Sequence, residues 1–319
     1  VLPLTFGVAL AAVSFFAQFR KVVAIHLVAM GFALIAAETY MLSVSPTLED
    51  YRREAADAWG VVDDGRDRLQ VILDHERDGK EAFPPIVSWQ LMIGGPNGTT
   101  RSSIEIHGKE VLPLAGISRV LTVACNEYGF WLTFTSDEHG FNNPPELWDS
   151  NGVDLVLLGD SFTFGNCVPS EQHFAGIIRK KHPKTLNLGY VNWGPVATYA
   201  TLVEYGPAVA PKHVFWFFFE GNDMTNMTTE RTSPLLMRYV EGQFNQGLLN
   251  RQSELDTVLK ERVAQLRHRE VTEPAGGQEF IGKLAQVILL RNVRKAVGVK
   301  AFKKENRPVE WKLYPELLE

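Results

Sequence analysis

The chain has 319 residues, of which 45% are hydrophobic and 22% charged, and its formal net charge is -5. This is the composition of an ordinary globular protein, and the length allows roughly one to three domains. The Lys and Arg residues form no long basic block. Because nucleic-acid binding draws on clustered Lys and Arg, we do not expect nucleic acid as a partner.

Residues 1–44 predict two transmembrane helices. Two apolar runs, 1–16 and 22–44, are separated by a link that contains Arg20 and Lys21. Each run is near the length of a membrane span, and we expect the first to be truncated because the sequence begins inside it. The positive-inside rule places the link in the cytoplasm and the chain after Ser45 outside it, in the periplasm of a bacterial cell. A signal peptide and a pair of buried core helices remain alternative interpretations.

Two segments of different character follow. Residues 45–85 are charged and helix-friendly, which predicts a juxtamembrane helical stalk ended by Pro84 and Pro85. Residues 86–150 are typical of a strand-rich segment: the stretch 94–98 is a turn signal, and 130–134 has strand composition.

From Val153 onward, apolar strands alternate with helices. We expect strands at 154–158, 185–188 and 213–219, helices at 171–181 and 196–209, and further helices at 252–269 and 278–297 that form an insertion after about residue 230. Strands apolar on both faces predict a parallel sheet covered by helices, with Trp216 to Phe219 in its core. In such sheets the site lies at the carboxyl ends of the strands.

The residues at these strand ends suit acyl transfer. Ser161 stands at a sharp strand-to-helix turn, where a hydroxyl is exposed near a helix N-terminus. The backbone N–H groups of Ser161 and Asn192 and the side-chain amide of Asn222 could donate to an oxyanion. Asp160 and Asp223 act either as capping residues or as site residues.

These blocks resemble the SGNH hydrolase family. Gly159-Asp160-Ser161 matches its first block and Gly221-Asn222-Asp223 its third, each after an apolar strand. The stretch from Asp137 to Asn143 is similar to one that precedes the serine in a membrane-anchored bacterial subgroup. The resemblance implies an α/β fold, a flavodoxin-like three-layer α/β/α sandwich over residues 151–319, C-terminally incomplete, with Ser161 as the catalytic nucleophile.

The chain departs from the family pattern in two places. Asn192 stands where the family has a glycine, and Gly194 is the alternative oxyanion donor. The family's Asp-x-x-His block is absent, so we expect the catalytic histidine and aspartate beyond residue 319. Among the histidines present, only His139 is a local candidate. We expect His173 to point away from Ser161, while His182 lies in a basic loop and His213 at the opposite end of its strand.

Cys125 and Cys167 are the two cysteines of the chain. In an oxidising compartment they could form a disulfide, and the alternative is two buried thiols. No Cys/His spacing suggests zinc, and we expect neither a metal nor a cofactor.

The resemblance and the predicted location together suggest a function. We expect an extracytoplasmic serine esterase that removes acyl groups, above all acetyl, from a cell-surface or secreted glycan through a Ser161 acyl-enzyme. One alternative is an O-acetyltransferase acting on an exopolysaccharide, since transfer and hydrolysis share the acyl-enzyme. Another is a non-catalytic glycan-binding or assembly component that retains the scaffold. Fold alone does not decide among them.

Overall fold

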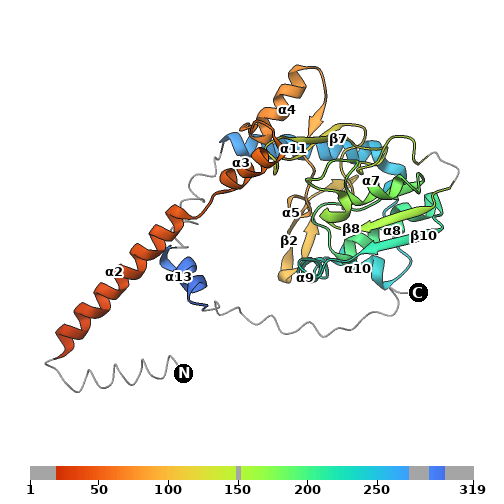
Figure 1. Ribbon diagram of the computed structural model, residues 1–319. Coiled ribbons are helices and arrows are strands. Elements are labelled where there is room, and N and C mark those ends of the chain that lie inside the picture. The colour runs from red at the N-terminus through yellow and green to blue at the C-terminus, as the bar shows by residue number, and fades with distance from the viewer. Residues whose placement is uncertain (1–18, 149–151, 273–286, 299–319) are drawn as a thin grey trace. The chain divides into compact units, whose positions relative to one another are not determined.

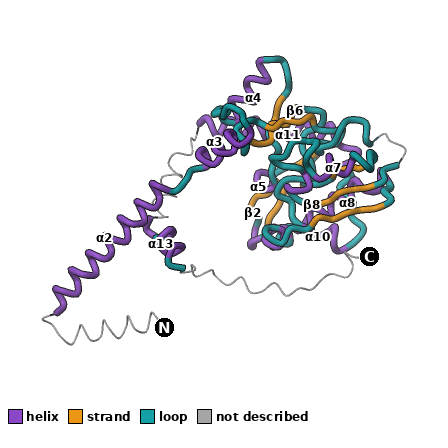
Figure 2. Tube along the Cα trace, viewed as in Figure 1, coloured by secondary structure: helices purple, strands orange, loops and turns teal. Residues whose placement is uncertain are grey.

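The computed structural model describes residues 19–148, 152–272 and 287–298. Contacts divide the chain into two compact units. The smaller one contains helices α2 (Arg20–Val44) and α13 (Arg291–Ala296), and the larger one runs from Leu48 to Arg269 (Figure 2).

The predicted second apolar helix is present as α2, whose apolar side chains are largely exposed, with Phe32 at 71% and Ile25 at 66%. The helical stretch Arg20–Trp59, which includes α2, is long and apolar enough to cross a membrane. Glu38 is the buried exception on α2. Its carboxylate accepts the backbone N–H groups of Asn292 and Val293 at 2.8 and 2.7 Å, which are otherwise unpaired at the start of α13. The first predicted helix, residues 1–16, lies outside the described residues.

The predicted stalk consists of two helices, α3 (Leu48–Trp59) and α4 (Arg68–Arg77). Helix α4 begins with a capping box, in which Asp67 and Gln70 each accept the other's backbone N–H. It buries Val71 and Ile72 beside the strands that follow. Because these side chains belong to a core, α4 is an integral part of the larger unit and not a free spacer.

The strand-rich segment contains short strands with one longer antiparallel pair. Strand β6 (Leu121–Cys125) pairs in parallel with β1 (Ala82–Phe83) and antiparallel with β7 (Leu132–Thr135). The expected turn at 94–98 contains the 3-10 turn η2 (Pro96–Gly98). The remaining elements are α5 (Ser88–Leu91), β2 (Met92–Gly94), β3 (Thr100–Ser102), β4 (Glu105–Ile106) and β5 (Lys109–Glu110).

The predicted parallel sheet is present, in the order β10-β8-β9, so this part of the fold is mixed α/β (Figure 1). The central strand β8 (Leu155–Gly159) is buried along its whole length, as its run of apolar residues requires. It pairs in parallel with β9 (Thr185–Asn187) and with β10 (His213–Phe217), with Leu155 opposite both Thr185 and His213. All three strands therefore end at the same edge of the sheet.

Helices between and after these strands cover the sheet and build the core. The short α6 (Ser161–Phe164) and α7 (Phe174–Arg179) precede β9, and α8 (Pro195–Val209), with proline in its first turn, precedes β10. After β10 come α9 (Asp223–Glu230), α10 (Pro234–Glu241), η3 (Leu248–Arg251) and α11 (Gln252–Thr272). Leu255, Leu259 and Val263 of α11 recur at helical spacing and are buried in the main core.

One prediction about β10 holds only in part. Trp216 packs against the main core as expected, but Phe218 and Phe219 are each 45% exposed, and Phe215 within the strand is 50% exposed. The reason is the position of β10, which pairs with β8 alone among the described strands and so forms an edge of the sheet. An edge strand is covered less completely than a central one.

Candidate active site

Ser161 begins α6 directly after β8, at the edge of the sheet where all three strands end. The turn before it needs glycine, because Gly159 has φ +153° and a Cβ there would lie 2.8 Å from the Phe217 carbonyl oxygen. Asp160 caps α6 by accepting the N–H of Phe162 at 3.0 Å. The Ser161 side chain is thereby held half-buried at a helix start.

Asp160 also connects the Ser161 turn to the end of β10. Its second oxygen, Oδ2, accepts the Asn222 Nδ2–H at 3.1 Å, and Asp160 is itself buried. An amide nitrogen carries two hydrogens, so Asn222 keeps a second donor for another acceptor. The first and third sequence blocks are therefore brought together, with Asp160 orienting the Asn222 amide.

The side chain of Asp223, the residue after Asn222, contacts the backbone of the loop that precedes it. Its Oδ2 accepts the N–H of Phe219 at 2.8 Å, and burial together with the nearby Asp160 charge raises its pKa to about 6. Its role in the structure is to fix the loop between β10 and α9. The N-cap of α9 is Asn222, so the hydrogen bond of the Asp223 side chain orders the loop before the helix and does not cap the helix.

The loop after β9 brings Asn192 to the same edge of the sheet. The N–H of Tyr190 donates to the Gly159 carbonyl at 3.2 Å, and a Cβ on Gly189 would lie 2.8 Å from the Phe164 N. Asn192 itself has φ +64°, in the left-handed region. Asn tolerates this conformation better than most residues other than glycine, so Asn can replace the glycine of the pattern without changing the backbone.

The structure does not support Gly194 as the alternative oxyanion donor. Its N–H donates to Glu230 Oε1 at 2.6 Å, and the N–H of Val196 donates to Oε2 at 3.0 Å. Burial raises the pKa of Glu230 to about 7, against these hydrogen bonds, which lower it. The carboxylate from α9 thus occupies the N-terminus of α8. The contact could not be predicted from the sequence, because Gly194 and Glu230 are 36 positions apart.

The local histidine candidate, His139, lies in a different environment from Ser161. Its ring packs on Trp148 at 4.4 Å and on Tyr205 at 5.8 Å, between centroids. Burial lowers its pKa. The other two expectations agree with the structure, since His182 is exposed in the loop after α7 and His213 starts β10.

His173 differs from its prediction, because it lines the same cavity as Ser161. Residues 165–173 are not helical, so the twelve positions after Ser161 do not turn the ring away. Its Nδ1 accepts the N–H of Gly176 at 3.3 Å and caps α7. Burial and the Arg179 charge lower its pKa to about 4. A neutral imidazole whose Nδ1 accepts a hydrogen bond carries its proton on Nε2, which suits a donor and not a general base.

Asp137 organises the segment before β8. It is buried, and its two oxygens accept four hydrogen bonds, from the backbone of His139 and Phe141 and from the side chains of Asn143 and Trp148. Asn143 in turn donates to the Asn187 carbonyl of β9 at 2.9 Å. The stretch that resembled a family block is therefore a support for the sheet. Its acidic and amide residues were visible in the sequence, but their partners were not.

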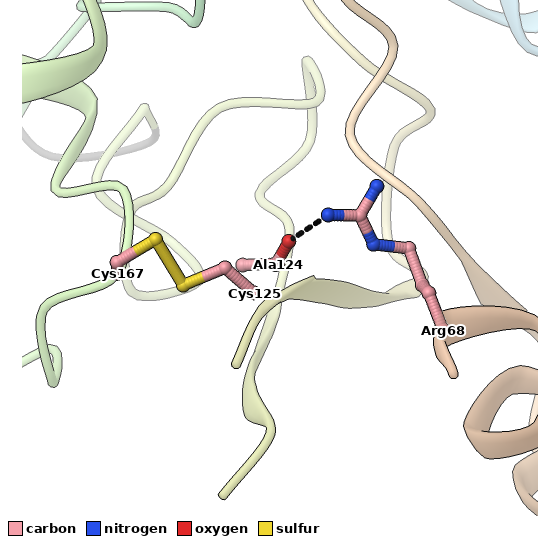
Figure 3. The surroundings of a disulfide bond; sticks show 4 residues. All are labelled: Arg68, Ala124, Cys125 and Cys167. Atoms are coloured by element: carbon pink, nitrogen blue, oxygen red, sulfur yellow. Dashed lines mark hydrogen bonds between the residues drawn. A yellow bond between two sulfur atoms is a disulfide. The ribbon is translucent and has the colours of Figure 1, made fainter. Parts of the chain in front are cut away.

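The structure joins Cys125 and Cys167 by a disulfide, with their Cα atoms 5.5 Å apart (Figure 3). Cys125 ends β6, and Cys167 lies in the loop after α6, where it lines the cavity of Ser161. The β6 end is held from the other side by Arg68 of α4, whose Nη2 donates to the Ala124 carbonyl at 2.8 Å. The disulfide therefore connects the small mixed sheet to the loop beside Ser161.

Comparison with known proteins adds no relative: no protein-family model, no curated protein and no solved structure matches the chain. The geometry described above is therefore the basis for any functional assignment.

Proposed function

We propose that this chain carries a serine esterase domain of the SGNH type, with Ser161 as nucleophile. The observation that carries the proposal is the Asp160 carboxylate, which caps the Ser161 helix and holds the Asn222 amide at 3.1 Å. Nucleophile and oxyanion donor must be fixed relative to each other for acyl transfer, and this contact connects them. The finer fold that belongs to this proposal is a flavodoxin-like three-layer sandwich.

In the proposed reaction the Ser161 Oγ forms a bond to the acyl carbon of an ester. The alcohol of the substrate leaves with the proton taken from the serine, and water then cleaves the acyl-enzyme to release the acid. The N–H groups of Ser161 and Asn192 and the free Asn222 N–H would hold the oxyanion. The substrate class that we propose is an acylated glycan, above all an acetylated one.

The reaction also needs a general base. His173 uses Nδ1 to cap α7, and His139 packs in the aromatic cluster of Trp148 and Tyr205. The proposal therefore assigns the role of the base to neither of these two histidines. Without an imidazole base, a serine hydroxyl is a weak nucleophile.

The proposed location is the outer side of a bacterial membrane. The helical stretch that could cross a membrane begins before the larger unit, at Arg20, and a disulfide lies within that unit. Disulfides persist in oxidising compartments such as the periplasm. Both observations support a membrane-anchored domain outside the cytoplasm.

The test is acetate release by the whole gene product from an O-acetylated glycan. Ser161→Ala should abolish release, and Asn222→Ala should lower the rate on the order of 100- to 1,000-fold. Ser253→Ala, on the exposed side of α11, is the matched control and should leave the rate unchanged. Undiminished release by Ser161→Ala would refute the mechanism. Acetyl capture by an added sugar acceptor would favour an acetyltransferase, and binding without any acyl chemistry would favour the non-catalytic component.

A further inference from the structure

Ser161 is among the residues that line a cavity of about 390 Å³. Three aromatic residues from three separate segments contribute to its wall: Tyr128 after β6, Phe162 of α6 and Phe174 of α7. Binding sites for small organic groups are concave and lined by aromatic side chains with a few placed polar groups. The cavity has the first of these features, and it lies where a group attached to the reacting ester would extend.

Each of these rings is held by another ring. Tyr128 stacks on Phe130 with centroids 6.1 Å apart, Phe162 packs edge-on against Phe219 at 4.7 Å, and Phe174 stacks on Phe217 at 5.2 Å. Phe162 and Phe174 are nevertheless 54% and 41% exposed. Rings that are fixed in place and exposed provide flat apolar surfaces at little entropic cost.

A buried polar group without a partner supplies the second feature. His173 is 3% exposed, and its Nε2 has no hydrogen-bond partner among the described residues. Because Nδ1 accepts the Gly176 N–H, Nε2 carries the proton and is a donor. A buried donor that is left unpaired costs free energy, and a ligand oxygen could satisfy it after a small shift of the cavity wall, because Nε2 is covered in this structure.

The charge of the residues that line the cavity favours an uncharged ligand over an anionic one. Glu127 is the charged residue in its described lining, which contains neither Lys nor Arg. A carboxylate ligand would meet an acidic wall with no cation to pair with it. Amides from Asn166 and Gln172 also line the cavity, so the lining is more polar than an acyl chain would need.

We propose that this cavity binds an uncharged sugar ring of the acylated glycan, with Phe162, Phe174 and Tyr128 against the ring and the His173 Nε2–H donating to one of its oxygens. The assignment rests on the proposed function for the presence of a glycan ester at Ser161. It deepens that function by separating neutral glycans from uronic-acid polymers. His173 is a binding residue in this scheme and takes no part in proton transfer.

The test is calorimetric binding to the full chain in detergent, in the Ser161→Ala background so that no turnover occurs. The probes are an O-acetylated cello-oligosaccharide, an O-acetylated oligogalacturonate and decanoate. We expect the neutral oligosaccharide to bind best, and Phe162→Ala to weaken its binding roughly tenfold. Phe215→Ala is the matched control, since that ring is equally exposed on β10 but does not line the cavity.

His173→Asn separates binding from folding. Asn is a good helix cap, so α7 should keep its capping acceptor while the Nε2 donor is lost. We expect weaker oligosaccharide binding with an unchanged circular dichroism spectrum. Preference for the oligogalacturonate or for decanoate, or equal losses from Phe162→Ala and Phe215→Ala, would overturn the assignment. Oligosaccharide binding without acetate release by the serine-containing protein would leave the sugar site standing and refute the esterase.

Discussion

At the scale of single residues, the backbone at Asn192 determines which side chains the loop tolerates. Its φ of +64° costs most residues about 1–2 kcal/mol, glycine almost nothing and Asn an intermediate amount. Asn192→Gly should therefore retain the unfolding free energy, whereas Asn192→Val should lower it by the difference between the Val and Asn costs, on the order of 1 kcal/mol. Urea unfolding midpoints of the two variants give the comparison. Equal midpoints would show that the loop does not hold this conformation.

Glu230 makes stability depend on pH. Burial raises its folded-state pKa to about 7, from the ordinary value of 4.5. The folded state therefore retains a proton that the unfolded state has lost between these values, so the contribution of Glu230 is complete below pH 4.5 and declines as the pH rises through 7. The unfolding free energy should therefore fall by at most about 1.4 kcal/mol per pH unit because of this one proton.

Glu230→Gln isolates this contribution, because it removes the titration while Asp223 remains. We expect the unfolding free energy of the wild-type protein to fall more steeply between pH 4.5 and 7 than that of the variant. Thermal or urea unfolding at several pH values measures both slopes. If the unfolding free energies of the two proteins had the same slope against pH, the Glu230 carboxyl group would not be buried away from water as it is in the structure.

The residue scale also shows what the sequence can predict. Ser161 and Asn222 follow apolar strands, and strand ends of a parallel sheet meet at one edge, so their proximity could be predicted. The Gly194 contact with Glu230 could not, because it depends on how α9 packs against the start of α8. His173 was misjudged because the predicted helix 171–181 includes it, whereas α7 begins at Phe174 and His173 is its N-cap.

At the scale of elements, the disulfide joins β6 to the loop after α6 across 42 positions of the chain. Closing such a loop restricts the unfolded chain and typically stabilises a protein by about 2–4 kcal/mol. The double variant Cys125→Ser, Cys167→Ser should lose stability in this range. A reducing agent should lower the unfolding midpoint of the wild-type protein toward that of the variant and leave the variant unchanged. If the reducing agent left the unfolding midpoint of the wild-type protein unchanged, the Cys125–Cys167 disulfide would be contradicted.

The same scale explains which elements were predictable. The apolar run of β8 and the proline-started α8 have the composition and length of a buried strand and a helix, and both are present within a residue or two. Strand β10 was also predicted, but the exposure of its side chains was not, because an apolar run does not indicate whether a strand is central or at an edge of the sheet. The packing of α4 and α11 into the core likewise depends on contacts distant in sequence.

At the scale of the whole molecule, the orientation across the membrane and the disulfide should be coupled. If Arg20 and Lys21 keep the start of α2 in the cytoplasm, the larger unit lies in an oxidising compartment, where its two thiols can pair. Replacing both residues by glutamate removes the positive charge that sets this orientation. A fraction of the chains should then keep the larger unit in the cytoplasm with Cys125 and Cys167 reduced.

Thiol labelling of cells measures this coupling, since the chain has two cysteines and both belong to the disulfide. After lysis under denaturing, non-reducing conditions, the wild-type protein should bind almost no maleimide and the Arg20→Glu, Lys21→Glu variant a measurable fraction. Lys180→Glu, Lys181→Glu is the control for charge alone, because these exposed residues follow α7 in the larger unit and do not flank α2. Full labelling of the wild-type protein would place the larger unit in a reducing compartment. The thiols would then be free in the cell, and the proposal of an extracytoplasmic enzyme would fail.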